Sequence, residues 1–224
     1  MTRFTRTLLL FKQEGFEKLQ STNILLLGVG GVGSFALDCL YRSGVGNITI
    51  IDGDCFDITN QNRQIGAFEG VGKKKVEVLS AMYPGINAID LRLNPKIIDD
   101  FDFSKFDVVI DAIDDITSKI ALALKIANKK EENMPILLSS TGSAKKLDPS
   151  QIKFSNIWKS YGDKFARKFR DGLKKEGFKG NFMVVFSPET PQCKELGSFS
   201  GVTGSFGLRL ASEAIKIILQ KDKK

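Results

Sequence analysis

The sequence contains no histidine, and its three cysteines, Cys39, Cys55 and Cys193, form no Cys-x-x-Cys pair. The missing histidine excludes Ser-His-Asp hydrolases, His-Glu-x-x-His metalloproteases and any histidine general base. The scattered cysteines argue against a disulfide framework and a structural zinc site, so we expect reduced thiols. These absences leave chemistry that needs neither histidine nor zinc.

Long apolar runs are absent too. The longest, such as 24–27 and 215–219, fall far below the roughly 20 residues that span a bilayer. The apolar patch at 8–11 is followed by no small-residue cleavage site. We therefore expect a cytoplasmic enzyme with no membrane partner. At 224 residues, without an internal repeat or linker, the chain is expected to form a single domain over residues 1–224.

Positive charge is concentrated in one segment. The net charge is +7, and residues 159–179 carry eight basic side chains against three acidic ones. Such a cluster suits a polyanionic partner, although a solvated helix face would look the same. Phe165, Phe169 and Leu173 recur at helical spacing, which predicts a buried stripe rather than a platform for stacking bases.

Buried strand patterns alternate with helix patterns along the chain. Strands are predicted at 23–27, 47–52, 88–93, 108–111, 135–140, 152–156 and 182–186, and helices at 32–43, 72–82, 116 to about 130, and 200–219. This alternation predicts an α/β fold with a doubly wound, mostly parallel sheet, a Rossmann-like half and antiparallel additions in the C-terminal third. Ligands of such sheets bind at the carboxyl ends of the strands.

A glycine-rich segment, Gly28–Gly33, lies between the first predicted strand and helix. Its backbone amides and the helix N-terminus would let a phosphate approach without interference from Cβ atoms. The same letters fit the dinucleotide fingerprint, with Asp52 placed to bind a ribose. A nicotinamide-dependent oxidoreductase is therefore the first interpretation.

Later motifs argue against that interpretation. Asp52-Gly53-Asp54 is followed by Asn60–Gln64, Val71–Lys75 and Asp111–Asp115. Over roughly the first 140 residues, their order and spacing resemble the ubiquitin-activating-enzyme-like (ThiF-like) adenylating superfamily. Members of this superfamily use ATP to convert a carboxylate into an acyl-adenylate. That chemistry needs cations, Mg²⁺ and fixed dipoles rather than a histidine.

Further segments resemble one branch, the tRNA threonylcarbamoyladenosine dehydratases. They are Asn62–Ile65, Val109–Asp114, Asp148–Ile152, Lys164–Arg170, Val185–Glu189 and Gly197–Gly204. Two segments depart from the branch: 139–146 is less glycine-rich than expected, and the stretch between Glu189 and Gly197 is short. The loops that contact the substrate are affected more than the ATP site.

The resemblance implies roles for individual residues. The loop glycines Gly28, Gly30, Gly31 and Gly33 would bind ATP, with Asp52 at the ribose, Asn60, Arg63 and Lys75 at the phosphates, and Asp114 at Mg²⁺. Asp54 is expected to support the loop. Arg6 resembles the arginine that enters the neighbouring subunit's site, which implies a homodimer. With Arg63, Lys75 and Asp114 it completes the predicted catalytic set.

Each assignment has a simpler alternative. Arg63 and Lys75 alone would pass for surface cations, and Asp114 for a helix N-cap. Lys73 and Lys74 compete with Lys75, although the spacing from Val71 and Gly72 favours Lys75.

The dehydratase resemblance implies a concrete reaction. ATP would adenylate the threonyl carboxylate of threonylcarbamoyladenosine beside the tRNA anticodon, and the adjacent urea group would displace AMP, with net loss of one water. The nucleophile is tethered, so no covalent enzyme intermediate is needed. We expect the tRNA to contact five basic residues, Lys164, Arg167, Lys168, Arg170 and Lys175.

Other functions remain open from the sequence. The second is adenylation of a sulfur-carrier or ubiquitin-like protein, in which Cys193 would carry an acyl or persulfide group. The oxidoreductase is a remote third, and a non-enzymatic RNA-binding module comes last. A cysteine desulfurase or sulfur-acceptor protein is a further candidate partner.

Overall fold

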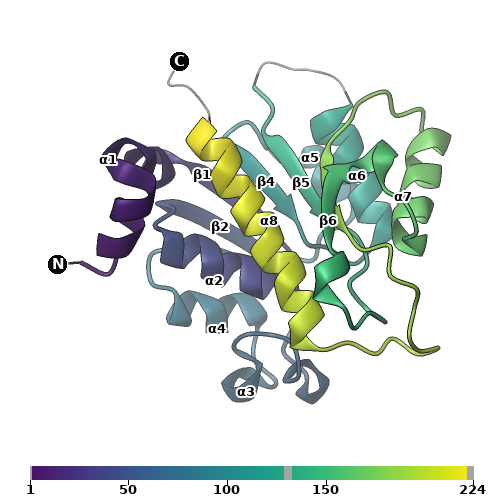
Figure 1. Cartoon of the computed structure of the whole chain (residues 1–224), viewed down its shortest axis with the longest axis horizontal. Helices are drawn as coiled ribbons and strands as arrows, with labels where there is room; N and C mark the ends of the chain where they lie inside the picture. Colours follow the sequence, from purple (N-terminus) through teal and green to yellow (C-terminus); the bar gives the residue numbers. More distant parts are fainter. Residues whose placement is uncertain (1, 129–132, 221–224) are drawn as a thin grey trace.

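The computed structural model describes residues 2–128 and 133–220. It contains one seven-stranded sheet in the order β3-β2-β1-β4-β5-β7-β6 (Figure 1). The strands are β1 (Asn23–Leu27), β2 (Asn47–Asp52), β3 (Asn87–Asp90), β4 (Val108–Asp111), β5 (Ile136–Ser140), β6 (Lys153–Asn156) and β7 (Met183–Phe186). The helices are α1 (Thr5–Ser21), α2 (Gly33–Ser43), α3 (Ala67–Gly70), α4 (Lys75–Met82), α5 (Pro95–Asp100), α6 (Ile116–Ala127), α7 (Lys164–Lys175) and α8 (Ser200–Gln220).

Strand directions confirm the predicted doubly wound sheet. All neighbouring strands pair in parallel except β6 and β7. Among the strands described, only β6 is therefore an antiparallel addition, because β7 runs parallel to β5. The order of the strands along the sheet reverses direction between β1 and β4, which makes this position the topological switch point. In open α/β sheets, ligands bind at the switch point.

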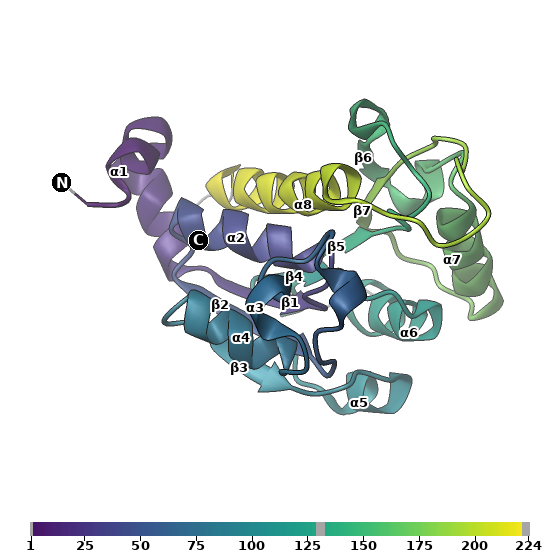
Figure 2. The same cartoon turned by 90° about the horizontal axis from the view of Figure 1, so that it is seen from below.

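Apolar side chains of the strands point alternately to the two faces of the sheet and pack into two separate hydrophobic cores. In β1, Ile24 and Leu26 pack into the core on one face, while Leu25 and Leu27 pack into the other. Helices α1, α2, α4 and α8 supply the first core, and α5, α6 and α7 supply the second. Figure 2 shows α2 and α8 on one side of the sheet and α5 and α6 on the other. Burial on both faces explains why the central strands are almost wholly apolar.

Some element boundaries differ from those predicted. The helix predicted from residue 72 begins at Lys75, because Gly72 has a positive φ of 82° that ends the preceding turn. Helix α1, which the sequence pattern did not predict, is kinked at Lys12 (φ 61°). The predicted helix end near residue 130 lies outside the described residues. Over the residues described, no helix has the length and apolar character needed to cross a membrane.

Candidate active site

The glycine-rich segment forms a tight loop from the end of β1 into α2. Gly28 has a φ of 82°, and a Cβ there would lie 2.8 Å from the carbonyl oxygen of Ala112. Ser34 N donates to the Gly30 carbonyl at 2.9 Å, which joins the loop to the first turn of α2. The loop therefore places backbone amides and a helix N-terminus at the switch point, an arrangement suited to binding phosphate.

Asp52, at the carboxyl end of β2, braces this loop. Its Oδ2 accepts from Val29 N at 2.9 Å, and its Oδ1 accepts from Asp54 N at 2.9 Å. The side chain is half-buried, and each carboxylate oxygen has a further lone pair. Asp52, the residue predicted to bind a ribose, thus lies beside the loop and can accept further hydrogen bonds.

Of three consecutive lysines, Lys75 is the buried one. It is 6% exposed, and its Nζ lies 3.3 Å from Asp54 Oδ2. Lys74 Nζ instead pairs with Asp90 Oδ1 at 3.0 Å, and Lys73 is exposed. Asp54 therefore contacts Lys75 directly, a pairing that the sequence analysis did not predict.

Arg63 lies against the glycine loop. Its Cγ and Cδ lie 3.3 Å from where a Cβ on Gly31 would stand, and its Nη1 donates to the Thr59 carbonyl at 2.8 Å. Asn60 completes the capping box of the preceding turn, whose N-cap is Asp57, because Asn60 Oδ1 accepts from Asp57 N at 3.1 Å. Arg63 therefore presents a cation beside the loop, while the Asn60 oxygen already has a partner.

Asp114 is not the cap of α6, so that alternative is wrong. Asp115 caps the helix by accepting from Ser118 N at 2.7 Å. Asp114 is exposed, and among the residues described no hydrogen bond or ion pair holds its carboxylate. One accessible carboxylate fits Mg²⁺, which binds one or two carboxylates together with substrate phosphates and water. In the described part of the chain, no group of three or more histidine, cysteine, aspartate or glutamate residues could hold a metal.

Arg92 is a site residue that the sequence analysis missed. Its Nη2 lies 2.6 Å from Asp54 Oδ1, and the hydrogen bond to Asp54 raises its pKa above the usual value. The negative charges of Asp114 and Asp52 also raise the pKa of Arg92. No local motif marks Arg92, because it reaches the site only through the pairing of β3 with β2.

Two buried polar residues near the loop were also missed. Lys119 is 1% exposed, and its Nζ lies 2.8 Å from Asp111 Oδ1. Burial lowers the pKa of Lys119, against the opposing effect of Asp111. Gln64 is 9% exposed and faces Gly30, and its Oε1 is the one buried side-chain polar atom among the described residues that lacks a partner.

Within one chain the structure does not bring Arg6 to the glycine loop. Thr203 of α8 lies beside Gly31, whereas Leu219, at the other end of α8, lies beside Gly15 of α1. At about 1.5 Å per residue, these two α8 positions are roughly 24 Å apart. Arg3, three residues before Arg6, donates to Tyr41 Oη at 3.1 Å near the C-terminal end of α2, whereas the glycine loop leads into the N-terminal end of α2.

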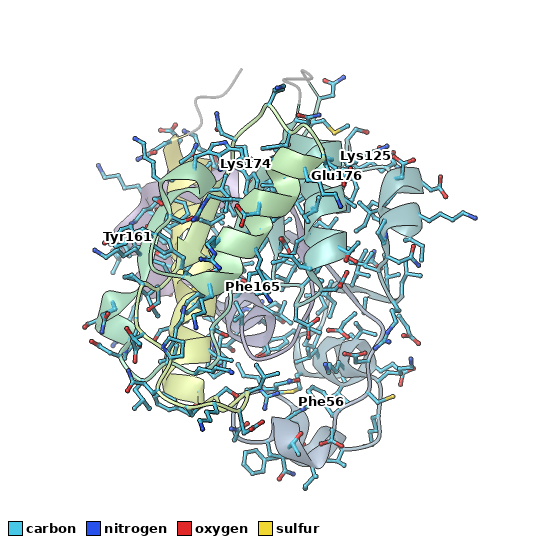
Figure 3. All side chains as sticks on the ribbon, turned by 90° about the vertical axis from the view of Figure 1, so that its right-hand side faces the viewer. Phe56, Lys125, Tyr161, Phe165, Lys174 and Glu176 are labelled. Atoms are coloured by element: carbon cyan, nitrogen blue, oxygen red, sulfur yellow. The ribbon has the colours of Figure 1, made fainter. Side chains whose placement is uncertain are left out.

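The predicted tRNA-binding residues lie on α7, which faces the viewer in Figure 3. Phe169 and Leu173 are fully buried and Phe165 is half-buried, so the apolar stripe packs inward as predicted. The basic residues Lys164, Arg167, Lys168 and Lys175 are exposed. Arg170 is half-buried because its guanidinium donates to Ser160 Oγ, which makes it the least available of the five.

Helix α7 begins at the same edge of the sheet as the glycine loop. Its N-cap, Asp163, accepts from Ala166 N at 2.9 Å. The same carboxylate accepts from Thr141 Oγ1 at 2.8 Å and from Lys146 Nζ at 2.8 Å. Because Thr141 directly follows β5, these contacts fix the start of the basic helix to the carboxyl end of that strand.

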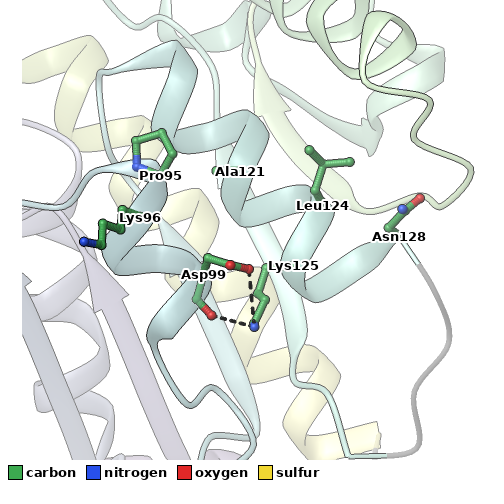
Figure 4. Close-up of a pocket in the computed structure, with 7 residues that line it drawn as sticks. All are labelled: Pro95, Lys96, Asp99, Ala121, Leu124, Lys125 and Asn128. Carbon is green, nitrogen blue, oxygen red and sulfur yellow. Dashed lines mark hydrogen bonds and ion pairs between the residues drawn. The ribbon is translucent and has the colours of Figure 1, made fainter.

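A large surface hollow lies elsewhere. It measures about 620 Å³ and lies between α5 and α6, where Lys125 Nζ donates to the Asp99 carbonyl at 2.6 Å (Figure 4). Pro95, Lys96, Ala121, Leu124 and Asn128 complete its lining, which includes none of the predicted site residues. We assign the active site by the loop and its charged side chains, not by the size of this hollow.

Comparison with known proteins gives a consistent result. The ThiF family model matches residues 4–224. The tRNA threonylcarbamoyladenosine dehydratase of Bacillus subtilis is 40% identical over 196 residues, covering 84% of this chain and 76% of that protein. The Escherichia coli protein of the same name is 32% identical over 256 residues, covering 98% and 94%.

Solved structures of the Escherichia coli dehydratase, TcdA, share the fold. The complex with AMP superposes with a TM-score of 0.89 at 31% identity, covering 97% of this chain and 94% of that one. The complex with ATP gives 0.88 at 32% identity, covering 97% and 93%. The chain therefore belongs to the ThiF family, in its tRNA threonylcarbamoyladenosine dehydratase branch.

Proposed function

We propose that this chain is an ATP-dependent enzyme that cyclises threonylcarbamoyladenosine beside the tRNA anticodon. The observation that carries the proposal is the grouping of Arg63 and Lys75 around a glycine loop at the switch point of the sheet. This grouping offers fixed cations and amides to a triphosphate and supplies no histidine base. The names of the relatives supply the substrate.

The reaction follows in two steps. A carboxylate oxygen of the threonyl group attacks the α-phosphorus of ATP, and pyrophosphate leaves. The urea group then attacks the activated carbonyl carbon, AMP departs with the former carboxylate oxygen, and one proton passes to water. Ring closure is fast without a covalent enzyme intermediate because nucleophile and electrophile belong to one side chain.

The chain's own residues bind and orient ATP in this scheme. Asp52 accepts from the ribose hydroxyls, and the loop amides bind the phosphates. Arg63 and Lys75 neutralise the phosphates as negative charge develops on the leaving group, with Asn60 beside them. Asp114 would hold Mg²⁺, which when bound supplies further charge neutralisation at the phosphates.

The basic face of α7 is proposed as the docking surface for the tRNA. Its exposed lysines and Arg167 suit the phosphates of an anticodon stem, and its start beside β5 puts it at the edge of the sheet that holds the proposed ATP site. The buried Phe169 and Leu173 cannot stack on bases. Recognition by this helix would therefore depend on charge and shape.

A homodimer completes the proposed site. Leu9 and Leu10 of α1 are 81% and 75% exposed, which suits a helix that is covered by a second copy. In that arrangement Arg6 would enter the partner's site. Four points stay predictions from the sequence: a single adenylating domain over residues 1–224, a ligase-type classification, a cytoplasmic location and a sulfur-relay partner.

The deciding experiment measures the modified nucleoside directly. The purified protein is incubated with ATP, Mg²⁺ and tRNA that bears or lacks threonylcarbamoyladenosine, followed by mild digestion, mass analysis and a pyrophosphate assay. Loss of one water from the modified tRNA alone supports the proposal. Pyrophosphate release with a diglycine-ended carrier protein, and no change in the tRNA, would instead favour the sulfur-carrier alternative.

A further inference from the structure

A buried network lies directly behind the turn that carries Asp114. Lys119 Nζ, in α6, lies 2.8 Å from Asp111 Oδ1, and both side chains are 1% exposed. Asp111 Oδ2 accepts from Ser139 Oγ of β5 at 2.6 Å. The network thus joins β4, β5 and α6 at the carboxyl edge of the sheet.

Stability alone gives little reason for this network. Removing two charges from water is unfavourable, and the attraction between them offsets this cost only with good geometry. Well-packed apolar residues of similar volume often stabilise a core as well or better. A buried ion pair in such a place is therefore better explained by the geometry that it imposes on its surroundings.

The network fixes the backbone of the Asp111–Asp115 turn. Asp111 Oδ1, the oxygen that receives Lys119, also accepts from Ile113 N at 3.1 Å. At the far end of the turn, Asp115 caps α6 through Ser118 N. Between these two anchors, Asp114 has no hydrogen bond or ion pair of its own among the residues described. Its position is therefore set by the turn.

The same turn supports the glycine loop. The Ala112 carbonyl lies so close to Gly28 that a Cβ there would approach it to 2.8 Å. The carboxylate proposed for the metal and the loop proposed for the phosphates therefore share one backbone segment. A displacement of Asp111 would move both.

We propose that Lys119 is a positioning residue: by fixing Asp111 it holds the turn that carries Asp114 against the glycine loop. The inference rests on the proposed function only for the role of Asp114 as a metal ligand. Lys119 is fully buried, and its direct ion-pair partner is Asp111.

The test replaces the ion pair by a neutral pair and measures metal binding. K119M/D111N leaves no unpaired charge in the core. Mn²⁺ binding is followed by electron paramagnetic resonance in the presence of a non-hydrolysable ATP analogue, and analogue binding is measured separately in EDTA. We expect the Mn²⁺ half-saturation concentration to rise at least about tenfold, as for other residues that orient metal ligands, with little change in EDTA.

A kinetic measurement separates positioning from general damage. The variant should need more Mg²⁺ for half-maximal turnover, while kcat at saturating Mg²⁺ recovers to within about threefold of the wild type. Loss of kcat with an unchanged Mg²⁺ requirement would overturn the inference. So would a Mn²⁺ half-saturation concentration that stays within twofold of the wild-type value.

Two further variants serve as controls. K146M/D163N neutralises the other buried lysine–aspartate pair described, also joined at 2.8 Å, and should leave Mn²⁺ binding unchanged. D114A should abolish binding of Mn²⁺ to the protein. If it does not, the assignment of Asp114 fails and this inference fails with it, whereas loss in D114A but not in K119M/D111N overturns only the role of Lys119.

A third variant covers the case in which K119M/D111N fails to fold. S139A keeps both charges and removes the donor that orients Asp111 Oδ2. A two- to threefold rise in the Mn²⁺ half-saturation concentration is expected. An unchanged value would contradict the proposal.

Discussion

Lys75 is buried with its ammonium 3.3 Å from the half-exposed carboxylate of Asp54. Held this way, the cation is already ordered before a triphosphate arrives, which reduces the entropy lost on binding. An incoming phosphate oxygen would replace or join the Asp54 oxygen as its partner. The arrangement explains why a lysine can be buried at the edge of an open site.

Replacing Lys75 should therefore lower activity more than replacing Lys73 or Lys74. We expect K75A to lower kcat/KM for dehydration by about 10²–10³-fold, as when one preorganised donor to a developing charge is removed. K73A is the matched control, because Lys73 is exposed, and it should stay within about twofold. A larger loss in K73A than in K75A would shift the lysine assignment.

Asp54 should give stability a specific pH dependence. Burial raises its pKa, but the hydrogen bonds from Arg92 and Lys75 outweigh this effect and leave the pKa below its usual value of 3.8. Because the folded-state pKa is lowered, the stabilisation is present above the unfolded-state pKa and is lost as pH falls through the folded-state pKa.

We expect D54N to melt below the wild type at pH 6 and to approach it at about pH 3. Asp54 is half-exposed and screened by water, so the difference at pH 6 should be only about 0.5 kcal/mol, or roughly 1–2 °C in Tm. Melting curves across this range measure it. A gap that widens as pH falls would contradict the ion-pair account.

Charge reversal on α7 should weaken tRNA binding through its salt dependence. In K164E/R167E/K168E, the slope of log K against log salt should fall by about three, one for each lost phosphate contact. Binding of an ATP analogue should be unchanged. K96E/K105E, with Lys96 in α5 and Lys105 in the segment after it, is the control. A slope change of about two there, in proportion to its two reversed charges, would mean that net charge matters rather than this helix.

Mixed dimers can test the role proposed for Arg6. R6A and K75A should each be inactive as homodimers, because each lacks one residue of the shared site. Random mixing should restore roughly a quarter of wild-type activity, since half of the dimers are mixed and each holds one intact site. If no activity returns although dimers exchange, Arg6 does not act in trans.

The exposed leucines of α1 should be needed for the same assembly. L9D/L10D is expected to shift the protein towards monomer in sedimentation analysis and to lower activity, because charged side chains would have to be buried between copies. Binding of the ATP analogue to the glycine loop should persist. A variant that remains dimeric would place the interface elsewhere.

The sequence alone determined the order of the strands, the position of the glycine loop and the family, because these signals are local. Short continuous apolar runs identify buried parallel strands. The positive φ at Gly28 and its close approach to Ala112 favour glycine at that position, so the loop can be recognised from its glycines. The basic stripe of α7 was also predictable, since helical spacing separates Phe169 and Leu173 from the charged face.

Only the tertiary structure decided which charged groups meet. Lys75 was separated from Lys73 and Lys74 by burial, and Arg92 reached Asp54 through the pairing of two strands. Lys119 joins Asp111 because α6 folds back over β4. These contacts link residues that have no common motif, so their energies depend on distances and burial that exist only in the folded chain.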